Sequence, residues 1–252
     1  MPELADKKFW QDFWQNVKIP ALVDMSFSND RVIAETILKY SPFDKTKDAL
    51  ELGCAPGKWM VFLNQKCGFR VDGIEYVKAA ADTTRNNLEI NGIADSHVYE
   101  GDFMTVPIGR KYDTVLSLGF LEHFENPKVI MRKSLELLKS RGRVIIGVPN
   151  FRGINYCIAK YLDSRKNLLS NHNIKVMDLG FFKKQALDYG LKIDYCGYLG
   201  GFEPALFDIS SHSYCMRVIL AVIFRFLRAV SWNPVMKPFF SGYMLAVYTA
   251  GK

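Results

Sequence analysis

Four short stretches of the sequence place chemically useful residues directly after apolar runs. "ALELGCAPGKW" sets Gly53 and Gly57 around a turn, and "VDGIEY" contains Glu75. Further on, "EGDF" contains Asp102 and "SLGFLEHF" contains His123. A strand that enters a glycine turn and then a helix presents backbone N–H groups to a ligand. A carboxylate after the next strand can accept two hydrogen bonds at once. These stretches therefore predict a small-ligand site with a titratable histidine beside it.

The spacing of the turn separates three ligands that are commonly held in this way. A Walker phosphate loop needs four residues between its glycines and Ser or Thr after the Lys, whereas three residues intervene here and Trp59 follows Lys58. A dinucleotide fingerprint counted from Gly53 needs further glycines where the chain has Ala55 and Lys58. Pro56 also lacks an N–H that a pyrophosphate could use. A nicotinamide oxidoreductase is disfavoured, and S-adenosylmethionine, which has no phosphate, is the remaining ligand.

The elements that must position these residues alternate between strand and helix patterns. Strands are predicted at 48–53, 70–76, 97–102, 112–119 and 143–150, with helices at 58–66, 78–90 and 127–139. A segment of mixed polarity (151–177) leads to a helix near 179–189, a strand at 191–199, a long insertion (202–242) and a last strand. Such alternation predicts an α/β fold with a parallel sheet covered by helices on both faces.

In this order the stretches resemble the motifs of the seven-stranded (Rossmann-like, class I) S-adenosylmethionine (SAM)-dependent methyltransferases. "ALELGCAPGKW" is similar to motif I, although Ala55 stands where the family usually has Gly. "YDTVLSLGFLEHFENP", with its Leu-Glu-His, resembles the fourth-strand motif of the small-molecule (type 11/23-like) branch. The resemblance implies a doubly wound, mostly parallel sheet with an antiparallel last strand. It also implies a division into an N-terminal helical lid (1–47) and a methyltransferase domain (48–252) with cap insertions at 151–177 and 202–242.

The resemblance also implies which residues bind the cofactor S-adenosyl-L-methionine. Glu75 would hold both ribose hydroxyls, Asp102 the adenine amino group and Phe103 the adenine ring. Glu51 would either hold the glycine turn or approach the methionine amine. The expected cofactor-binding set is Glu51, Gly53, Cys54, Gly57, Glu75, Tyr76, Asp102, Phe103 and Leu118.

His123 is the candidate catalytic residue because it follows the fourth strand, where methyl group and acceptor would meet. Two interpretations remain open: a general base, or a residue that organises the loop. Methyl transfer from a sulfonium can need only positioning of the acceptor. His172 and His212, in the insertions, could also face an acceptor. No His, Asp or Glu spacing indicates a metal-binding helix or loop, so no metal is expected.

Composition indicates which cellular compartment and which class of partner the protein favours. The five cysteines include no CxxC pair, which favours a reducing cytoplasm over a disulfide framework. The net charge of +7 lies wholly after Asn150, where 13 basic residues meet 6 acidic ones. Nucleic acid is nevertheless disfavoured as a partner, because no target-recognition motif such as Asn-Pro-Pro-Tyr follows the fourth strand.

Two apolar segments lie outside the motifs. Phe9, Trp10, Phe13 and Trp14 fall at helical spacing and predict either a core helix or a lid over the cofactor. In the stretch Tyr214–Trp232, three arginines at 217, 225 and 228 share one narrow arc of an otherwise apolar helix. That helix could pack as a cap, lie at a membrane surface, or form a homodimer contact.

The sequence as a whole predicts a SAM-dependent methyltransferase that acts on a small or lipid-like acceptor, with O-methylation favoured. One alternative is a methyltransferase of RNA or protein. Another is a non-catalytic partner subunit with the same fold, which the intact binding residues oppose.

Overall fold

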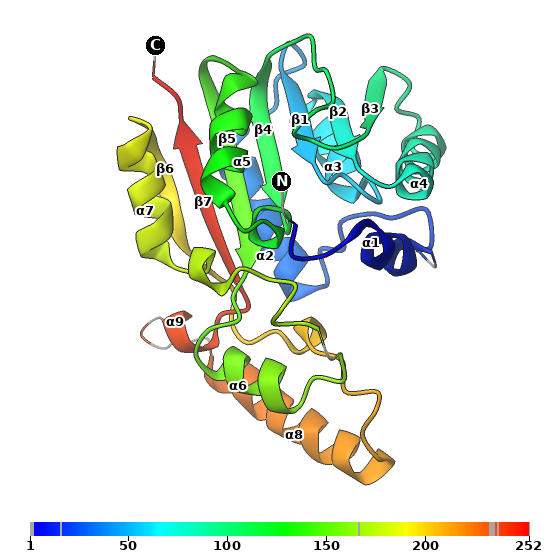
Figure 1. The fold of residues 1–252 in the computed structure, drawn as a ribbon, viewed down its shortest axis with the longest axis vertical. Helices are drawn as coiled ribbons and strands as arrows, with labels where there is room; N and C mark the ends of the chain where they lie inside the picture. Colours follow the sequence, from blue (N-terminus) through cyan, green and yellow to red (C-terminus); the bar gives the residue numbers. More distant parts are fainter. Residues whose placement is uncertain (1–2, 16, 166, 232–234, 236, 252) are drawn as a thin grey trace.

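A seven-stranded sheet forms the centre of the computed structural model, which describes residues 3–15, 17–165, 167–231, 235 and 237–251 (Figure 1). Its strand order is β3-β2-β1-β4-β5-β7-β6. Strands β1 to β5 pair in parallel, whereas β7 is antiparallel to both of its neighbours. The strands are β1 (Asp48–Leu52), β2 (Arg70–Glu75), β3 (Ser96–Glu100), β4 (Tyr112–Leu118), β5 (Leu138–Pro149), β6 (Lys192–Leu199) and β7 (Tyr243–Thr249). The predicted Rossmann-like fold with an antiparallel last strand is confirmed.

Helices cover both faces of this sheet, as the apolar strands require. One hydrophobic cluster joins the sheet to α2 (Ser28–Tyr40), α3 (Lys58–Cys67) and α4 (Lys78–Ile90). The other joins it to α5 (Pro127–Glu136) and α7 (Leu179–Asp188). Both predicted helices at 58–66 and 78–90 are present with nearly the expected bounds.

Helix α5 ends three residues earlier than predicted, and β5 begins five residues earlier. Leu138 already pairs with Tyr112 in the sheet, and the register shifts before Arg143 pairs with Thr114. Arg141 accommodates this irregularity with a φ of 61°. The helical apolar pattern continued through Leu137 and Leu138, which are both buried in the core, although Leu138 already belongs to β5.

The N-terminal segment divides into two parts with different surroundings. Helix α2 buries Ile33, Ala34 and Ile37 in the core and contacts β6 and β7. It is therefore part of the sheet's cover. Only α1 (Lys7–Trp14) lies away from the sheet, beside α4 (Figure 1).

The two insertions gather beyond the carboxyl ends of β4 and β5 as α6 (Ile154–Tyr161), α8 (Tyr214–Val230) and α9 (Lys237–Phe240) (Figure 1). Trp232, at the end of the predicted apolar helix, lies outside the described residues. Buried amides tie the insertions together: Asn155 Nδ2 donates to the carbonyls of Asn150 and Ser241, each at 2.9 Å. Asn150 Nδ2 donates to the carbonyl of Ser241 at 2.8 Å. Buried donors paired in this way hold the cap to the sheet.

Candidate functional site

The turn after β1 is shaped for close approach. Gly53 has a φ of +67°, which favours glycine, and a Cβ built there would lie 2.8 Å from Phe120 Cδ2. The N–H groups of Gly53 and Cys54 both donate to the carbonyl of Ile74, at 3.0 and 3.1 Å. These donors are used within the fold, contrary to the expectation that the turn offers them to a ligand. What Gly53 provides is a surface without a side chain.

Three other residues of the expected cofactor-binding set do not line either of the two cavities described below. Gly57 has a φ of +88°, and a Cβ there would meet Thr84 Cγ2 at 3.0 Å, so its glycine serves the contact between α3 and α4. Cys54 is buried beneath the turn. Glu51 is also buried, and its Oε2 has no hydrogen-bond partner among the described residues. Burial raises the pKa of Glu51. The cofactor contacts expected of these three residues stay predictions.

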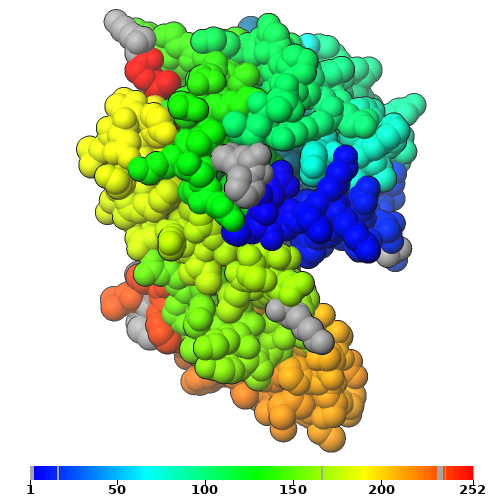
Figure 2. Space-filling view, viewed as in Figure 1, coloured from blue at the N-terminus to red at the C-terminus, as the bar shows by residue number. Residues whose placement is uncertain are grey.

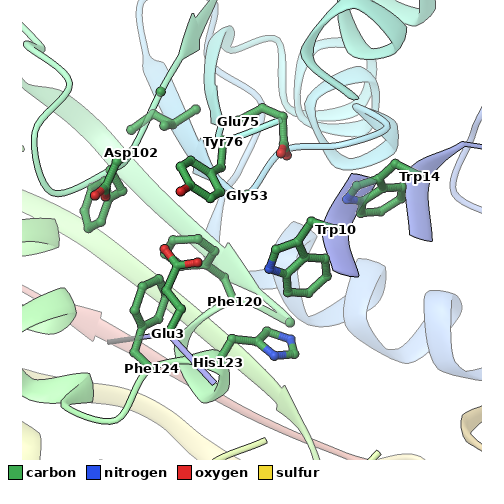
Figure 3. Close-up of a pocket in the computed structure, with 14 residues that line it drawn as sticks. Glu3, Trp10, Trp14, Gly53, Glu75, Tyr76, Asp102, Phe120, His123 and Phe124 are labelled. Atoms are coloured by element: carbon green, nitrogen blue, oxygen red, sulfur yellow. The ribbon is translucent and has the colours of Figure 1, made fainter. Parts of the chain in front are cut away.

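A narrow cavity of about 70 Å³ collects most of the expected set at the carboxyl ends of the strands (Figure 3). Five of the expected residues line it: Gly53, Glu75, Tyr76, Asp102 and Phe103. The sequence interpretation missed Glu3, Ile74, Gly101, Phe120 and Phe124, which also line it. Phe120 belongs to the quoted fourth-strand motif, which is the signal that could have found it.

Glu75 is buried at the end of β2 with its carboxylate facing this cavity (Figure 3). Its Oε1 accepts the N–H of Val77 at 3.0 Å, and its Oε2 accepts the N–H of Ala55 at 3.4 Å. Each carboxylate oxygen can accept further hydrogen bonds. Burial raises the pKa of Glu75, and the backbone N–H groups oppose that shift. The carboxylate is therefore fixed in orientation and still able to bind a diol.

Asp102 and Phe103 form the opposite wall. Asp102 Oδ1 accepts the N–H of Met104 at 2.7 Å, which orients the carboxylate. The Phe103 ring is buried edge-to-face with Phe120 at 5.9 Å, and Lys133 Nζ lies 5.0 Å from its centroid. An apolar wall beside an oriented carboxylate suits a planar base with an amino group.

Helix α1 closes the narrow cavity from the outside. Trp10 and Trp14 line it, with the Trp10 ring edge-on to His123 at 4.7 Å (Figure 3). Lys7 Nζ lies 4.7 Å from the centroid of Tyr76, and the N–H of Leu4 donates to the carbonyl of His123 at 2.8 Å. The N-terminal segment thus contacts residues on both sides of the cavity.

A second, larger cavity of about 640 Å³ adjoins the first. The two share residues Trp10, Trp14, Gly53, Gly119 and His123. The larger cavity also includes Leu118, from the expected cofactor set, and residues from α1 and both insertions. Those from α1 and the insertions are Phe9, Phe13, Phe151, Arg165, Asn167, Leu168, Asn171, His172, Ala205 and Leu206. Most of the cavity surface is apolar, and its polar groups come from Lys58, Glu122, His123, Arg165, Asn167, Asn171 and His172. Such a cavity suits a small molecule with a large apolar part and a polar end.

His123 lies at the junction of the two cavities, on the 3₁₀ turn η1 (Leu121–His123). Its Nδ1 lies 2.8 Å from the carbonyl of Asn171 and must donate to it, which leaves Nε2 as the acceptor of the neutral ring. Burial, with His172 adding to it, lowers the pKa of His123 to about 3. A base so weak is poorly matched to neutral pH.

His172 lies beside His123, with ring centroids 4.6 Å apart, and lines the larger cavity, while its contact with an acceptor stays a prediction. Burial lowers its pKa to about 4. His212 instead contacts the carbonyl of Leu162 and does not line either cavity. The sequence interpretation also missed Glu122, which is buried beside both histidines and whose pKa burial raises to about 8.

Comparison with known proteins identifies the family. Residues 27–195 match a family model described as a methyltransferase domain. The chain belongs to this family of SAM-dependent methyltransferases. The predicted family, enzyme class and transferase activity are thereby confirmed.

Two curated relatives of this methyltransferase are the ubiquinone biosynthesis O-methyltransferases of two Rickettsia bellii strains. Each is 28% identical over 109 residues, which are 41% of this chain and 42% of the relative. The match therefore spans less than half the length of those relatives.

Solved structures share the fold of this methyltransferase at low identity. A putative sarcosine dimethylglycine methyltransferase from Galdieria sulphuraria is 16% identical, with a TM-score of 0.57, covering 88% of this chain and 85% of the other. Coclaurine N-methyltransferase bound to N-methylheliamine and SAH is 13% identical, with a TM-score of 0.61, covering 93% and 75%. The [4+2]-cyclase SpnF is 13% identical, with a TM-score of 0.62, covering 94% and 85%. At these identities the comparison shows the fold alone.

Proposed function

We propose that this methyltransferase transfers a methyl group from SAM to an oxygen atom of a small or lipid-like acceptor. The observation that carries the proposal is the junction of the two cavities at Gly53, Gly119 and His123. Glu75 and Asp102 would hold the nucleoside of SAM, which would supply its methyl group at that junction. The acceptor then approaches from the larger cavity.

The residues of the narrow cavity fit the cofactor. The Glu75 carboxylate keeps acceptor capacity for two ribose hydroxyls, and Asp102 is positioned for an exocyclic amino group. Gly53 lets the methionine part pass without a Cβ in its way. SAM supplies an electrophilic methyl group on a positive sulfur. Tyr76, Phe103, Leu118 and the buried Glu51, Cys54 and Gly57 complete the proposed set.

The protein's contribution to the reaction is chiefly positioning and exclusion of water. Trp10 and Trp14 line both cavities at the junction, where they would shield the reacting atoms from water (Figure 3). In-line attack needs the acceptor oxygen, methyl carbon and sulfur in one line, and holding that geometry supplies much of the rate. His123 lines the junction in this scheme, and its low basicity argues against a role as general base.

Oxygen is the favoured methylated atom because the curated relatives are named as O-methyltransferases. A lipid-like acceptor is favoured by the apolar lining of the larger cavity and by α8. In the part of the chain that the structure describes, no helix has the length and apolar character needed to cross a bilayer.

The surface of α8 fits an anionic membrane. In Figure 2 the orange segment that contains α8 forms one end of the molecule. Only Leu220 and Phe224 of α8 are buried, while Val222 and Phe226 are each 65% exposed. At 100° per residue, six exposed apolar residues share an arc of about 140°: Val218, Val222, Phe226, Ile219, Val230 and Ile223. Arg217 and Arg225, both exposed, lie on one side of that arc. Arginines beside an exposed apolar arc suit lipid phosphates and acyl chains together.

Calorimetry and mass spectrometry test the proposal in two stages. The purified chain should bind SAM and S-adenosylhomocysteine (SAH) and show no response to NAD. With SAM present, phenols and catechols with and without an apolar chain should gain a methyl group on oxygen, unlike matched amines. Binding of NAD without either sulfur nucleoside would refute the cofactor, and N-methylation alone would refute the acceptor class.

A further inference from the structure

Three ligand-type side chains meet beside the larger cavity. Glu122, His123 and His172 place one potential ligand atom each so that all three atoms lie within 4.8 Å of one another. Glu122 Oε1 is 4.0 Å from His123 Nε2, which is too long for a hydrogen bond. Among the described residues, no hydrogen bond joins these three side chains. The cluster is therefore polar, inward-facing and not satisfied from within.

The hydrogen bonds of both histidines leave Nε2 free to bind a metal ion. Nδ1 of His123 lies 2.8 Å from the carbonyl of Asn171, and Nδ1 of His172 lies 2.6 Å from that of Leu168. Because a carbonyl only accepts, each Nδ1 carries the proton and each neutral ring keeps its lone pair on Nε2. Metal-binding histidines typically donate their other N–H to a backbone carbonyl or carboxylate, which fixes tautomer and ring orientation.

Glu122 gives an independent sign of a missing partner. Its side chain is 1% exposed, and its Oε2 has no hydrogen-bond partner among the described residues. A buried carboxylate without a partner is costly, because neither water nor protein replaces its hydration. A bound cation would satisfy it and favour its ionised form.

We propose that Glu122, His123 and His172 bind one divalent cation of the Zn²⁺ class, with an open coordination position toward the larger cavity. Two imidazoles and one carboxylate suit Zn²⁺ and its transition-metal neighbours better than Mg²⁺, which prefers oxygen ligands. Zinc–nitrogen bonds of about 2.1 Å place tetrahedral ligands roughly 3.4 Å apart. The three side chains would therefore close by about 1 Å around the ion.

The role of this ion rests on the proposed function. The acceptor's hydroxyl oxygen takes the open position, where the cation lowers its pKa and the proton passes to water. The oxygen then forms a bond to the methyl carbon while the sulfur–methyl bond breaks, and that electron pair stays on the sulfur as neutral SAH. No oxidant or reductant is needed.

Metal binding to the purified, chelator-treated chain tests the site directly. Calorimetry with Zn²⁺ should show one equivalent bound, and Co²⁺ should give visible absorption bands typical of nitrogen and oxygen ligation. His172→Gln and Glu122→Gln should each weaken Zn²⁺ binding by roughly 100-fold or more, above the 10–100-fold typical of outer-shell partners. His212→Gln is the matched control from the same cap and should bind as the parent does.

Circular dichroism shows whether each variant is folded, so that a folded variant still decides the test if the other one misfolds. His172 is only partly buried, so His172→Gln should fold even where a change at the fully buried Glu122 does not. Absence of Zn²⁺ binding by the folded parent, a preference for Mg²⁺, or unchanged binding by folded His172→Gln would each overturn the site.

SAH binding on the same samples separates this inference from the proposed function. SAH bound without Zn²⁺ overturns the cation site alone. Zn²⁺ bound without SAH overturns the proposed cofactor and leaves the cation site standing.

Discussion

The Trp10 ring is edge-on to the His123 ring, with centroids 4.7 Å apart, although Trp10 belongs to α1, the helix that lies away from the sheet. This contact joins the N-terminal segment to the residue at the junction of the two cavities. The narrow cavity is confined by Trp10, Trp14 and Phe120, so we expect α1 to shift when a nucleoside enters.

Trp10→Ala should therefore speed release of the cofactor. An aromatic contact of this kind contributes about 0.5–1.5 kcal/mol, so SAH should dissociate roughly 2- to 12-fold faster. Stopped-flow displacement of SAH measures the rate. Gln11→Ala, an exposed position on the same helix, is the control and should leave the rate unchanged. Equal rates for Trp10→Ala and the parent would argue against a lid.

Glu75→Ala should weaken the cofactor without unfolding the protein. Losing a buried charged acceptor of two hydrogen bonds costs about 2–4 kcal/mol, or roughly 30- to 700-fold in the Kd for SAH. Glu89→Ala, an exposed carboxylate on α4, should bind normally. Titration calorimetry gives both values, and a change below threefold at Glu75 would remove it from the ribose site.

Acid should also weaken cofactor binding through Glu75. Burial raises the pKa of Glu75, so its acceptor form is lost at a higher pH than that of an ordinary glutamate. The Kd for SAH should rise as pH falls from 7 to 5 in the parent, and rise less in Glu75→Gln, which cannot titrate. Parallel pH profiles for the two proteins would contradict this assignment.

Exchange of Arg217 and Arg225 for Gln should reduce binding to anionic liposomes. Arg228 is left in place because its guanidinium donates to Ser28 Oγ at 3.0 Å. Co-sedimentation should need anionic lipid and weaken with salt. The control exchanges two cations distant from the cap, Lys78 and Arg132, for an equal change in charge. A protein that ignores anionic vesicles at low salt has no membrane-facing helix here.

Acid stability should depend on the ion-pair network at the start of β1 and β4. Burial alone would raise the pKa of Asp113, but hydrogen bonds from Lys139 and Lys47 outweigh it and hold that pKa well below its usual range. A depressed pKa stabilises the fold above about pH 4, and the contribution is lost as pH falls further. Asp113→Asn should cost about 1 kcal/mol in urea unfolding at pH 7, and less at pH 3. An equal cost at both pH values would refute the network's role.

The sheet could be predicted well because its strands are apolar and because residues that favour turns separate them from the helices. Gly53 and Asp102 come shortly after parallel strands and Glu75 ends one. Because such strands end at one edge of the sheet, the proximity of these residues could be inferred. The start of β5 was missed because buried leucines at 137 and 138 fit a helix as well as a strand.

The cluster around Glu122 could not be predicted from spacing. His172 lies 49 positions after His123 and reaches it through an insertion whose path no periodic pattern fixes. The roles of the glycines also needed the structure: Gly57 faces Thr84, while Gly53 faces Phe120. Only the backbone conformation reveals which neighbour each glycine accommodates.

The paired asparagines constrain how the acceptor site can be re-engineered. Asn155 of one insertion donates to the carbonyl of Ser241, where the other insertion returns to the sheet. A graft that exchanged 151–177 alone would remove this donor and leave the buried carbonyl with the amide of Asn150, which lies outside both insertions. Loop transplants between members of the family should therefore be tolerated best when both insertions are exchanged together.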